Sequence, residues 1–334
     1  MAKVERREAL LAGDIGGTNA RLRLYDLLGA VVLDETNLSS ATAPSLEALL
    51  GPYLEEKKVD VRAAVLGVAG PVREGVAVTT NLPWVVAEER LSSDLGIPIV
   101  RVINDLVAIA LGCPRMPPEK LAVLHEGKAF PHGNVAVIAA GTGLGEAALV
   151  WNGDGYVPCA SEGGHCTFSP CTLVETDLLA FLRHRTPGGH VSWERVVSGP
   201  GLGAIYDYLL AATDYEEPEP IRQRLARGDR NATITELGLA KESPIAERAL
   251  EIFAEAFGAE AGNLVLKTLA TGGLYLAGRI AKTILPTHRE AFLRGFLDKG
   301  RMRSLLEDVP VSVVLDERVG LVGAGHLAAK LLAM

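Results

Sequence analysis

Two short glycine-rich turns between apolar segments constrain the fold of this chain more than any other feature. The first, Asp14-Ile15-Gly16-Gly17-Thr18-Asn19, follows the small apolar segment 9–13 and precedes 21–25, in which polar and apolar residues alternate. Alternation with a period of two predicts a strand with one buried face. After a turn at 26–29, residues 30–33 are predicted to form a third strand.

The same arrangement occurs a second time. Residues 135–139 are predicted as a buried strand and 140–145 as its glycine-rich turn, followed by strands at 146–151 and 156–160 joined by a hairpin turn at 152–155. The repeats of solenoids and propellers have much shorter periods. We therefore expect an α/β protein with two duplicated halves that face each other across a cleft.

The remaining segments alternate between helical and extended patterns. Ser198 is a candidate N-cap for the helix that Gly199-Pro200-Gly201 opens. The other expected helices are 45–57, one from Asp105, 173–185, 245–269 and one from Leu321, and the other expected strands are 63–68, 97–103, 274–277 and 311–315.

The glycine-rich turns indicate phosphate binding, because backbone N–H groups can approach phosphate oxygens where no Cβ intervenes. A dinucleotide-binding fold requires a helix directly after its glycines, and the turn at 152–155 follows Gly145 too closely for that. A Walker loop requires Gly-Lys followed by Ser or Thr, whereas Gly127-Lys128 is followed by Ala129. The remaining interpretation is a strand–turn–strand hairpin that binds phosphate, and it occurs twice in the chain.

Asp14 adds a carboxylate at the end of the first strand. Such a group beside phosphate suits Mg²⁺, held directly or through water. The alternative is that both segments are tight hairpins in which glycine supplies a positive φ. Two turns together with Asp14 favour phosphate binding.

Composition excludes several classes of protein. A chain of 334 residues corresponds to about two domains. The formal charge of −8 argues against nucleic-acid binding, which needs a basic face. No apolar segment approaches the ~18 residues that span a bilayer, and the N-terminus mixes charges of both signs, unlike a signal peptide. Four cysteines do not form a disulfide framework in so long a chain. We expect a cytoplasmic protein that does not bind membranes.

Taken together, these motifs resemble the bacterial glucokinase family of the actin/hexokinase/Hsp70-like ATPase superfamily. The likeness covers nearly the whole chain in order. It is carried by Asp14–Arg21, Thr80-Asn81, Ile103-Asn104-Asp105, Ala140–Gly145, Glu162-Gly163-Gly164-His165, Gly189–Ser192, Glu194-Arg195 and Ser198–Leu202.

The resemblance implies two ribonuclease-H-like (actin-like ATPase) domains around a central cleft. The smaller domain is expected to contain residues 1–110 and 317–334, and the larger one 111–316. The implied activity is phosphorylation of glucose at its 6-hydroxyl, with ATP and Mg²⁺, by a homodimer.

Phosphoryl transfer to an alcohol needs a base that accepts the hydroxyl proton. Asp105 suits this role because it follows the strand 97–103, at a sheet edge where α/β proteins bind ligands, and the resemblance assigns the base to the same residue. The alternative is that Asn104 or Asp105 only caps the following helix. The resemblance further implies glucose contacts from Asn81, Asn104, Asp105, Glu162, His165 and Glu194.

For ATP, the resemblance implies contacts from both glycine-rich turns. Asp14 is expected to hold Mg²⁺ or its water, and Ser198–Gly201 and Gly278 are expected to lie near the nucleoside. Arg279 departs from the family, which has a second glycine there; it could stack on adenine, reach a phosphate or point to solvent. The expected ATP-binding residues are Asp14, Gly16, Gly17, Thr18, Asn19, Gly141, Thr142, Gly143, Gly199 and Gly278.

Three further possibilities were weighed. Cys159, Cys166 and Cys171 have no Cys-x-Cys spacing and fit no common zinc motif, so no zinc is expected. A sugar-sensing regulator on the same fold would carry a helix-turn-helix ahead of Asp14, where only 13 residues lie. A kinase for another hexose or for an N-acyl amino sugar stays open, since epimers differ by one hydroxyl.

Overall fold

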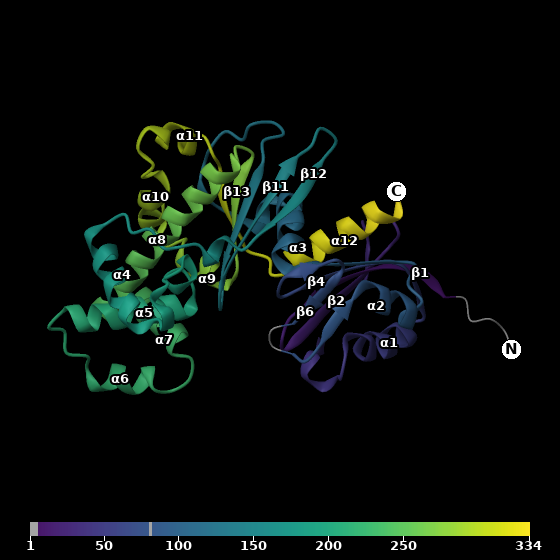
Figure 1. The fold of residues 1–334 in the computed structure, drawn as a ribbon, viewed down its shortest axis with the longest axis horizontal. Coiled ribbons are helices and arrows are strands. Elements are labelled where there is room, and N and C mark those ends of the chain that lie inside the picture. Colours follow the sequence, from purple (N-terminus) through teal and green to yellow (C-terminus); the bar gives the residue numbers. More distant parts are fainter. Residues whose placement is uncertain (1–5, 80–81) are drawn as a thin grey trace. The chain divides into compact units, whose positions relative to one another are not determined.

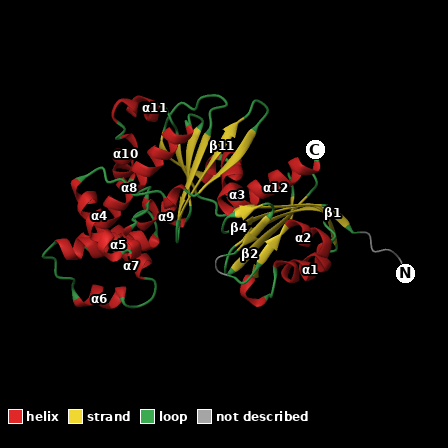
Figure 2. Ribbon diagram, in the orientation of Figure 1, coloured by secondary structure: helices red, strands yellow, loops and turns green. Residues whose placement is uncertain are grey.

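A computed structural model describes residues 6–79 and 82–334. The chain forms two compact units, one comprising Met1–Pro117 with Asp316–Met334 and the other Pro118–Leu315 (Figure 1). Both units contain helices and strands (Figure 2). Among the residues described, no helix combines the length and apolar character needed to cross a membrane.

The first unit is built on a five-stranded sheet in the order β3-β2-β1-β4-β8. β1, β2 and β3 pair antiparallel, whereas β4 and β8 run parallel to β1. A small sheet of β5, β6 and β7 accompanies it. The elements are β1 (Arg7–Ile15), β2 (Asn19–Tyr25), β3 (Val32–Ser39), α1 (Leu46–Lys57), β4 (Val59–Val68), β5 (Val72–Arg73), β6 (Val76–Val78), β7 (Val85–Ala87), α2 (Glu88–Leu95), β8 (Ile99–Asn104), α3 (Asp105–Gly112) and α12 (Val319–Leu332).

Both faces of the first sheet are covered, so β1 is apolar on both sides. Ala9 and Leu11 lie in a core that contains Leu46 of α1 and residues of α2. Leu10 and Ala12 lie in a second core with residues of α12. The last helix of the chain therefore completes the first unit.

One strand of this sheet differs from the prediction. Residues 30–33 were expected to form the third strand, but Asp26 closes a turn there by accepting hydrogen bonds from the backbone of Ala30 and Val31. β3 runs over Val32–Ser39 instead. It is a mostly polar edge strand with little buried surface, so its sequence carries no hydrophobic pattern.

The second unit repeats the topology of the first. Its sheet has the order β12-β11-β10-β13-β14-β9, and its first five strands have the pairing directions of β3-β2-β1-β4-β8. β9 is added antiparallel at the edge. The elements are β9 (Leu121–His125), β10 (Val135–Ala140), β11 (Leu144–Trp151), β12 (Tyr156–Ser161), α4 (Leu173–Arg185), α5 (Gly199–Ala212), α6 (Glu219–Leu225), α7 (Arg230–Leu239), α8 (Pro244–Thr268), β13 (Gly273–Ala277), α9 (Arg279–Ile284), α10 (Arg289–Leu297), α11 (Arg303–Glu307) and β14 (Val311–Val314).

Capping residues fix several helix ends where the sequence predicts them. Ser45 accepts a hydrogen bond from Ala48 N at the start of α1. Thr172 and Glu175 form a capping box at the start of α4. Ser198 accepts from Gly201 N and caps α5. The expected helices 45–57, 173–185 and the one opened by Gly199 are confirmed.

Candidate active site

The first glycine-rich turn joins β1 to β2. Gly16 N donates to Asn19 O at 2.9 Å. Ser40, directly after β3, donates to the turn from its backbone N to Thr18 O and from its Oγ to Gly16 O. Thr18 and Asn19 are exposed, whereas Asp14 is partly buried at the end of β1. Burial raises the pKa of the Asp14 carboxyl, and the positive charge of Arg21 opposes this.

The second glycine-rich turn joins β10 to β11 and lies against the start of α5. Gly141 O accepts from Gly199 N at 2.8 Å, and Gly141 N donates to Gly143 O at 2.8 Å. The N-terminus of α5 thus lies beside the turn, where the helix dipole favours negative charge. A Cβ built on Gly141 would meet nothing within 4 Å.

The glycines of these turns are not required by their backbone angles. Gly16, Gly17, Gly141 and Gly143 are absent from the positive-φ residues of the described chain. The alternative that these glycines supply a positive φ is therefore wrong. At Gly141 the missing side chain leaves open space instead, which is what an approaching phosphate requires.

Glu194 braces the second turn. Its Oε2 accepts a hydrogen bond from Leu144 N at 3.1 Å, and a Cβ on Gly143 would lie 2.5 Å from the same oxygen. Its backbone oxygen accepts from Ser198 Oγ at 2.6 Å. Glu194 therefore links the turn to the N-terminus of α5, and this role was not predicted for it.

Glu162 and His165 project from one short turn after β12. Gly163–His165 form a 3₁₀ turn in which His165 N donates to Glu162 O. Both side chains are exposed, with His165 Nε2 3.9 Å from Glu162 Oε2. A Cβ on Gly164 would lie 2.0 Å from Leu144 O, so this turn packs directly on the second glycine-rich turn.

Asn104 and Asp105 stand where β8 ends and α3 begins. Asn104 caps α3, since its Oδ1 accepts from Leu106 N at 2.9 Å, and its Nδ2 donates to Gly70 O at 3.0 Å. Asp105 is the first residue of the helix and is partly exposed. Asn104 therefore does cap the helix, and its second Nδ2 hydrogen has no hydrogen-bond partner among residues 6–79 and 82–334. Asn81, the remaining expected sugar contact, lies outside the described residues.

A cavity of 570 Å³ in the second unit adjoins the second glycine-rich turn. It is lined by Gly141, Thr142 and Gly199, which were predicted to bind ATP, and by Arg279. Gly278 is not among the lining residues; its φ of 89° and the close approach of Ala140 O explain its lack of a side chain. Sequence reasoning missed the polar wall supplied by α7 and α9, which consists of Asp229, Asn231, Thr235, Glu236 and Thr283.

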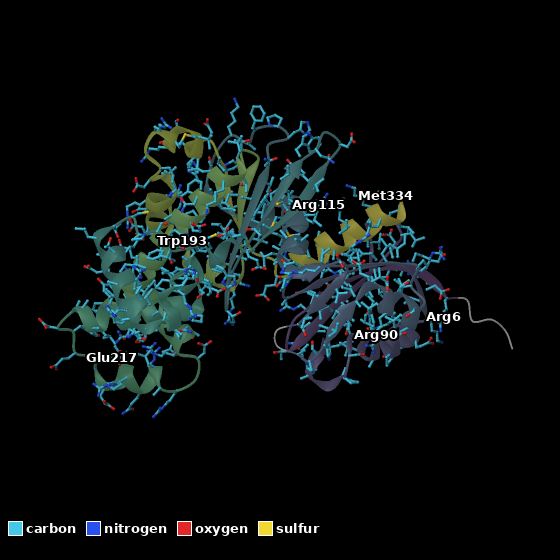
Figure 3. All side chains as sticks on the ribbon, viewed as in Figure 1. Arg6, Arg90, Arg115, Trp193, Glu217 and Met334 are labelled. Atoms are coloured by element: carbon cyan, nitrogen blue, oxygen red, sulfur yellow. The ribbon has the colours of Figure 1, made fainter. Side chains whose placement is uncertain are left out.

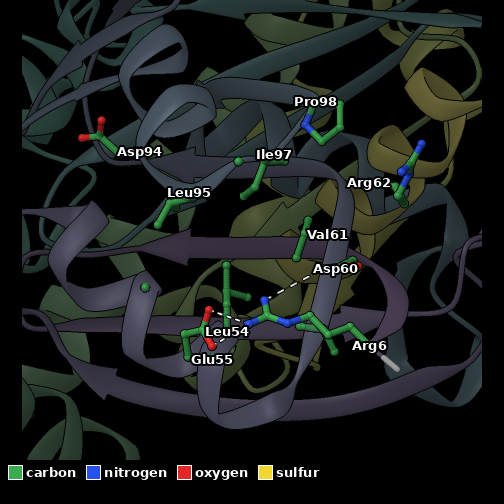
Figure 4. Close-up of a pocket in the computed structure, with 13 residues that line it drawn as sticks. Arg6, Leu54, Glu55, Asp60, Val61, Arg62, Asp94, Leu95, Ile97 and Pro98 are labelled. Carbon is green, nitrogen blue, oxygen red and sulfur yellow. Dashed lines mark hydrogen bonds and ion pairs between the residues drawn. The ribbon is translucent and has the colours of Figure 1, made fainter. Parts of the chain in front are cut away.

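A second cavity, of 360 Å³, lies in the first unit and contains none of the predicted site residues (Figure 4). Arg6 crosses it, donating to Glu55 at 2.6 Å and approaching Asp60 at 3.8 Å. Because this charge is already neutralised by the chain, the cavity offers no reason to assign a ligand.

Candidate metal ligands are the cysteines of the second unit and the carboxylate of Asp14. Cys159, Cys166 and Cys171 carry free, exposed thiols. No group of three or more His, Cys, Asp or Glu side chains in the described part of the chain could hold a metal by itself. Mg²⁺ does not require such a cage, because it commonly binds one or two carboxylates together with substrate phosphates and keeps several waters. The partly buried carboxylate of Asp14 fits that role.

Comparisons with known proteins agree with this arrangement. The family model described as Glucokinase matches residues 11–331. Glucokinase from Nostoc punctiforme is 40% identical over an alignment of 338 positions, gaps included, which covers 96% of this chain and 99% of the relative. The chain belongs to the glucokinase family.

Solved structures show the same relationship. The crystal structure of glucokinase from an Antarctic psychrotroph is 30% identical, has a TM-score of 0.84 and covers 96% of this chain and 99% of that one. Glucokinase from Balamuthia mandrillaris in complex with glucose, 23% identical with a TM-score of 0.79, covers 96% and 93% and shares the fold. The expected family, its fold of two actin-like ATPase domains and its activity, ATP-dependent phosphorylation of glucose, are confirmed.

Proposed function

We propose that this member of the glucokinase family transfers the γ-phosphoryl group of ATP to the 6-hydroxyl of glucose, with Asp105 as the base. The observation that carries the proposal is the packing of the turn bearing Glu162 and His165 on the glycine-rich turn 141–145, through Gly164 and Leu144 O. Groups able to bind sugar hydroxyls thus adjoin a phosphate-binding turn.

Sugar recognition is assigned to side chains with complementary hydrogen-bonding capacity. The Glu162 carboxylate accepts hydrogen bonds from vicinal hydroxyls, and His165 adds a donor or acceptor from the same rigid turn. Asn104 contributes the free hydrogen of its amide, and Asn81 and Glu194 are part of the same assignment. The Asp105 carboxylate accepts the proton of the attacking hydroxyl.

ATP is assigned to both glycine-rich turns and to the cavity of the second unit. In the second unit, Thr142 and Gly143 are assigned to phosphate oxygens. In the first unit, the phosphate-binding residues are Gly16, Gly17, Thr18 and Asn19. The adenosine occupies the 570 Å³ cavity. Asp14 would hold Mg²⁺, which neutralises charge on the phosphates when it is bound.

Replacement of Asp105 tests the assignment of the base. We expect Asp105→Ala to lower kcat by roughly 10²–10⁴-fold, because the hydroxyl loses its proton acceptor. Asp94→Ala, at an exposed aspartate of α2, serves as the control and should keep normal turnover. Near-normal kcat for Asp105→Ala would remove this residue from the role of base.

Sugar preference and phosphoryl donor are tested together. A coupled assay with glucose, mannose, fructose and N-acetylmannosamine, each with ATP and with ADP, should give the highest kcat/KM for glucose with ATP. A higher value for N-acetylmannosamine would favour the alternative of an amino-sugar kinase. A cytoplasmic location and a homodimer belong to the same proposal, and size-exclusion chromatography with light scattering tests the dimer.

A further inference from the structure

A buried carboxyl group lies beneath the turn that carries Glu162 and His165. Glu146 follows the second glycine-rich turn on β11, and only 2% of its surface is exposed. Its Oε1 has no hydrogen-bond partner among the residues described. A Cβ built on Gly163 would lie 1.9 Å from Glu146 Oε2 and 2.6 Å from its Cδ. The carboxyl therefore lies directly against the backbone of the turn, in the space that a side chain at position 163 would need.

The surroundings of Glu146 hold a second buried carboxylate. Glu260 on α8 is fully buried and accepts hydrogen bonds from Lys267 Nζ at 3.0 Å and from Asn263 Nδ2 at 2.9 Å. Lys267 also interacts electrostatically with Glu146 and with Cys166, the residue that follows the turn. The cation that faces the pair already neutralises Glu260, so a second negative charge beside it is unfavourable.

The charge state of Glu146 follows from this environment. Burial, followed by the negative charge of Glu260, raises the pKa of Glu146 to about 8, and Lys267 opposes this rise. At pH 7 the carboxyl is therefore mostly neutral. Ionisation would bring a desolvated charge against the backbone at Gly163.

We propose that Glu146 is a positioning residue for glucose: its buried carboxyl, packed against the backbone at Gly163, supports that backbone and so fixes the directions in which Glu162 and His165 project. This inference rests on the proposed role of Glu162 and His165 in sugar binding. It implies that the affinity for glucose falls when Glu146 ionises, whereas binding of ATP in its cavity changes less.

Steady-state kinetics between pH 6.5 and 9 test the inference with two substitutions. In the unmodified protein, KM for glucose should rise several-fold as the pH increases through the range in which Glu146 ionises. Glu146→Gln is neutral and of the same size, so it should keep a low KM for glucose and lose most of this rise. Glu146→Ala removes the support and should raise KM for glucose on the order of 10-fold at every pH, with a smaller change in KM for ATP.

Two further variants separate the possible failures. Glu175→Gln changes another buried glutamate, which accepts backbone hydrogen bonds at the start of α4, and should leave both KM values unchanged. Glu162→Ala tests the sugar assignment directly. If Glu162→Ala leaves KM for glucose unchanged, the proposed sugar site is wrong. If Glu162→Ala raises it but Glu146→Gln keeps the pH dependence of the unmodified protein, only the role of Glu146 is wrong. Should Glu146→Ala fail to fold, the comparison with Glu146→Gln still decides.

Discussion

Glycine at position 141 is explained by the proposed phosphate binding and not by a requirement of the fold. A glycine is explained structurally when its φ is positive or when a neighbouring atom occupies the place of a Cβ. Neither applies at Gly141, where the surrounding space is open. At Gly143 and Gly164, by contrast, Glu194 and the backbone of Leu144 occupy that place. For Gly141, a bound phosphate is thus the remaining explanation.

Substitution of Gly141 by alanine should therefore affect the substrate and not the fold. We expect Gly141→Ala to leave the melting temperature nearly unchanged and to raise KM for ATP roughly 10-fold or more, because the methyl group keeps the phosphates from the backbone amides. Gly155→Ala is the matched control, since Gly155 also has open space and no positive φ but lies in the hairpin turn between β11 and β12. Equal KM values for ATP in the two variants would contradict this account.

The contact between α3 and α12 depends on glycine for a different reason. A Cβ on Gly323 would lie 1.9 Å from Ala108 O, and one on Gly112 would lie 2.0 Å from Val319 O. The two helices therefore approach each other backbone to backbone. Because α3 begins with Asn104 and Asp105, this close contact also fixes the end of β8 at which the proposed base stands.

Alanine substitutions at two glycines of α12 should have opposite effects on stability. Gly323→Ala forces α12 away from α3 and should destabilise the protein by about 1–3 kcal/mol. At Gly320 a Cβ would meet only Ile109 at 3.7 Å, an ordinary contact. Gly320→Ala should therefore be neutral or stabilising by up to about 1 kcal/mol through its higher helix propensity. Thermal unfolding followed by circular dichroism measures both, and equal shifts for the two variants would show that the close contact is unimportant.

Stability of the whole protein should respond to pH through a half-buried histidine in the first unit and a buried glutamate in the second. In the first unit, burial and the charges of Arg115 and Lys330 lower the pKa of His326 to about 4, and Arg115 Nη2 lies 2.6 Å from its Nε2. Arg115 is labelled in Figure 3. Below pH 6.5 the unfolded chain binds a proton at this histidine, whereas the folded protein does so only near pH 4. The free energy of unfolding therefore decreases as the pH falls from 6.5 through 4. Glu146 in the second unit acts in the opposite direction. In the folded protein Glu146 retains a proton that it releases above pH 4.5 in the unfolded chain. The free energy of unfolding therefore decreases as the pH rises from 4.5 through about 8.

Replacing each of these two groups by the uncharged side chain of glutamine should remove its contribution to the pH dependence of stability. Relative to the unmodified protein, His326→Gln should gain in melting temperature as the pH is lowered from 6.5 to 4, and Glu146→Gln should gain as it is raised from 5 to 8. The exposed residues His184 and Glu56 supply the control variants His184→Gln and Glu56→Gln. Differences in melting temperature that do not change with pH would contradict the assigned ionisations.

Local features of the fold could be predicted from the sequence because their causes lie within a few residues of each other. The alternation in β2, the N-cap Ser198 of α5 and the turn at Asn152, whose Oδ1 accepts hydrogen bonds from Asp154 N and Gly155 N, all lie where they were predicted. The order of glycine-rich turns along the chain was likewise enough to indicate the family. β3 could not be placed because it buries too little apolar surface to leave a pattern.

Contacts between distant parts of the chain were decided by the tertiary structure. The residues around Glu146 in the sequence do not predict its contacts with Glu260 and with the backbone of Gly163. Those around Gly323 likewise do not predict its contact with Ala108. The same holds for the polar residues of α7 and α9 that line the 570 Å³ cavity, and for Glu194, whose carboxylate accepts a hydrogen bond from Leu144 N. Hydrogen bonding and hydrophobic periodicity act over a turn of helix or a pair of strands, whereas close packing and desolvation depend on whichever residues the completed fold brings together.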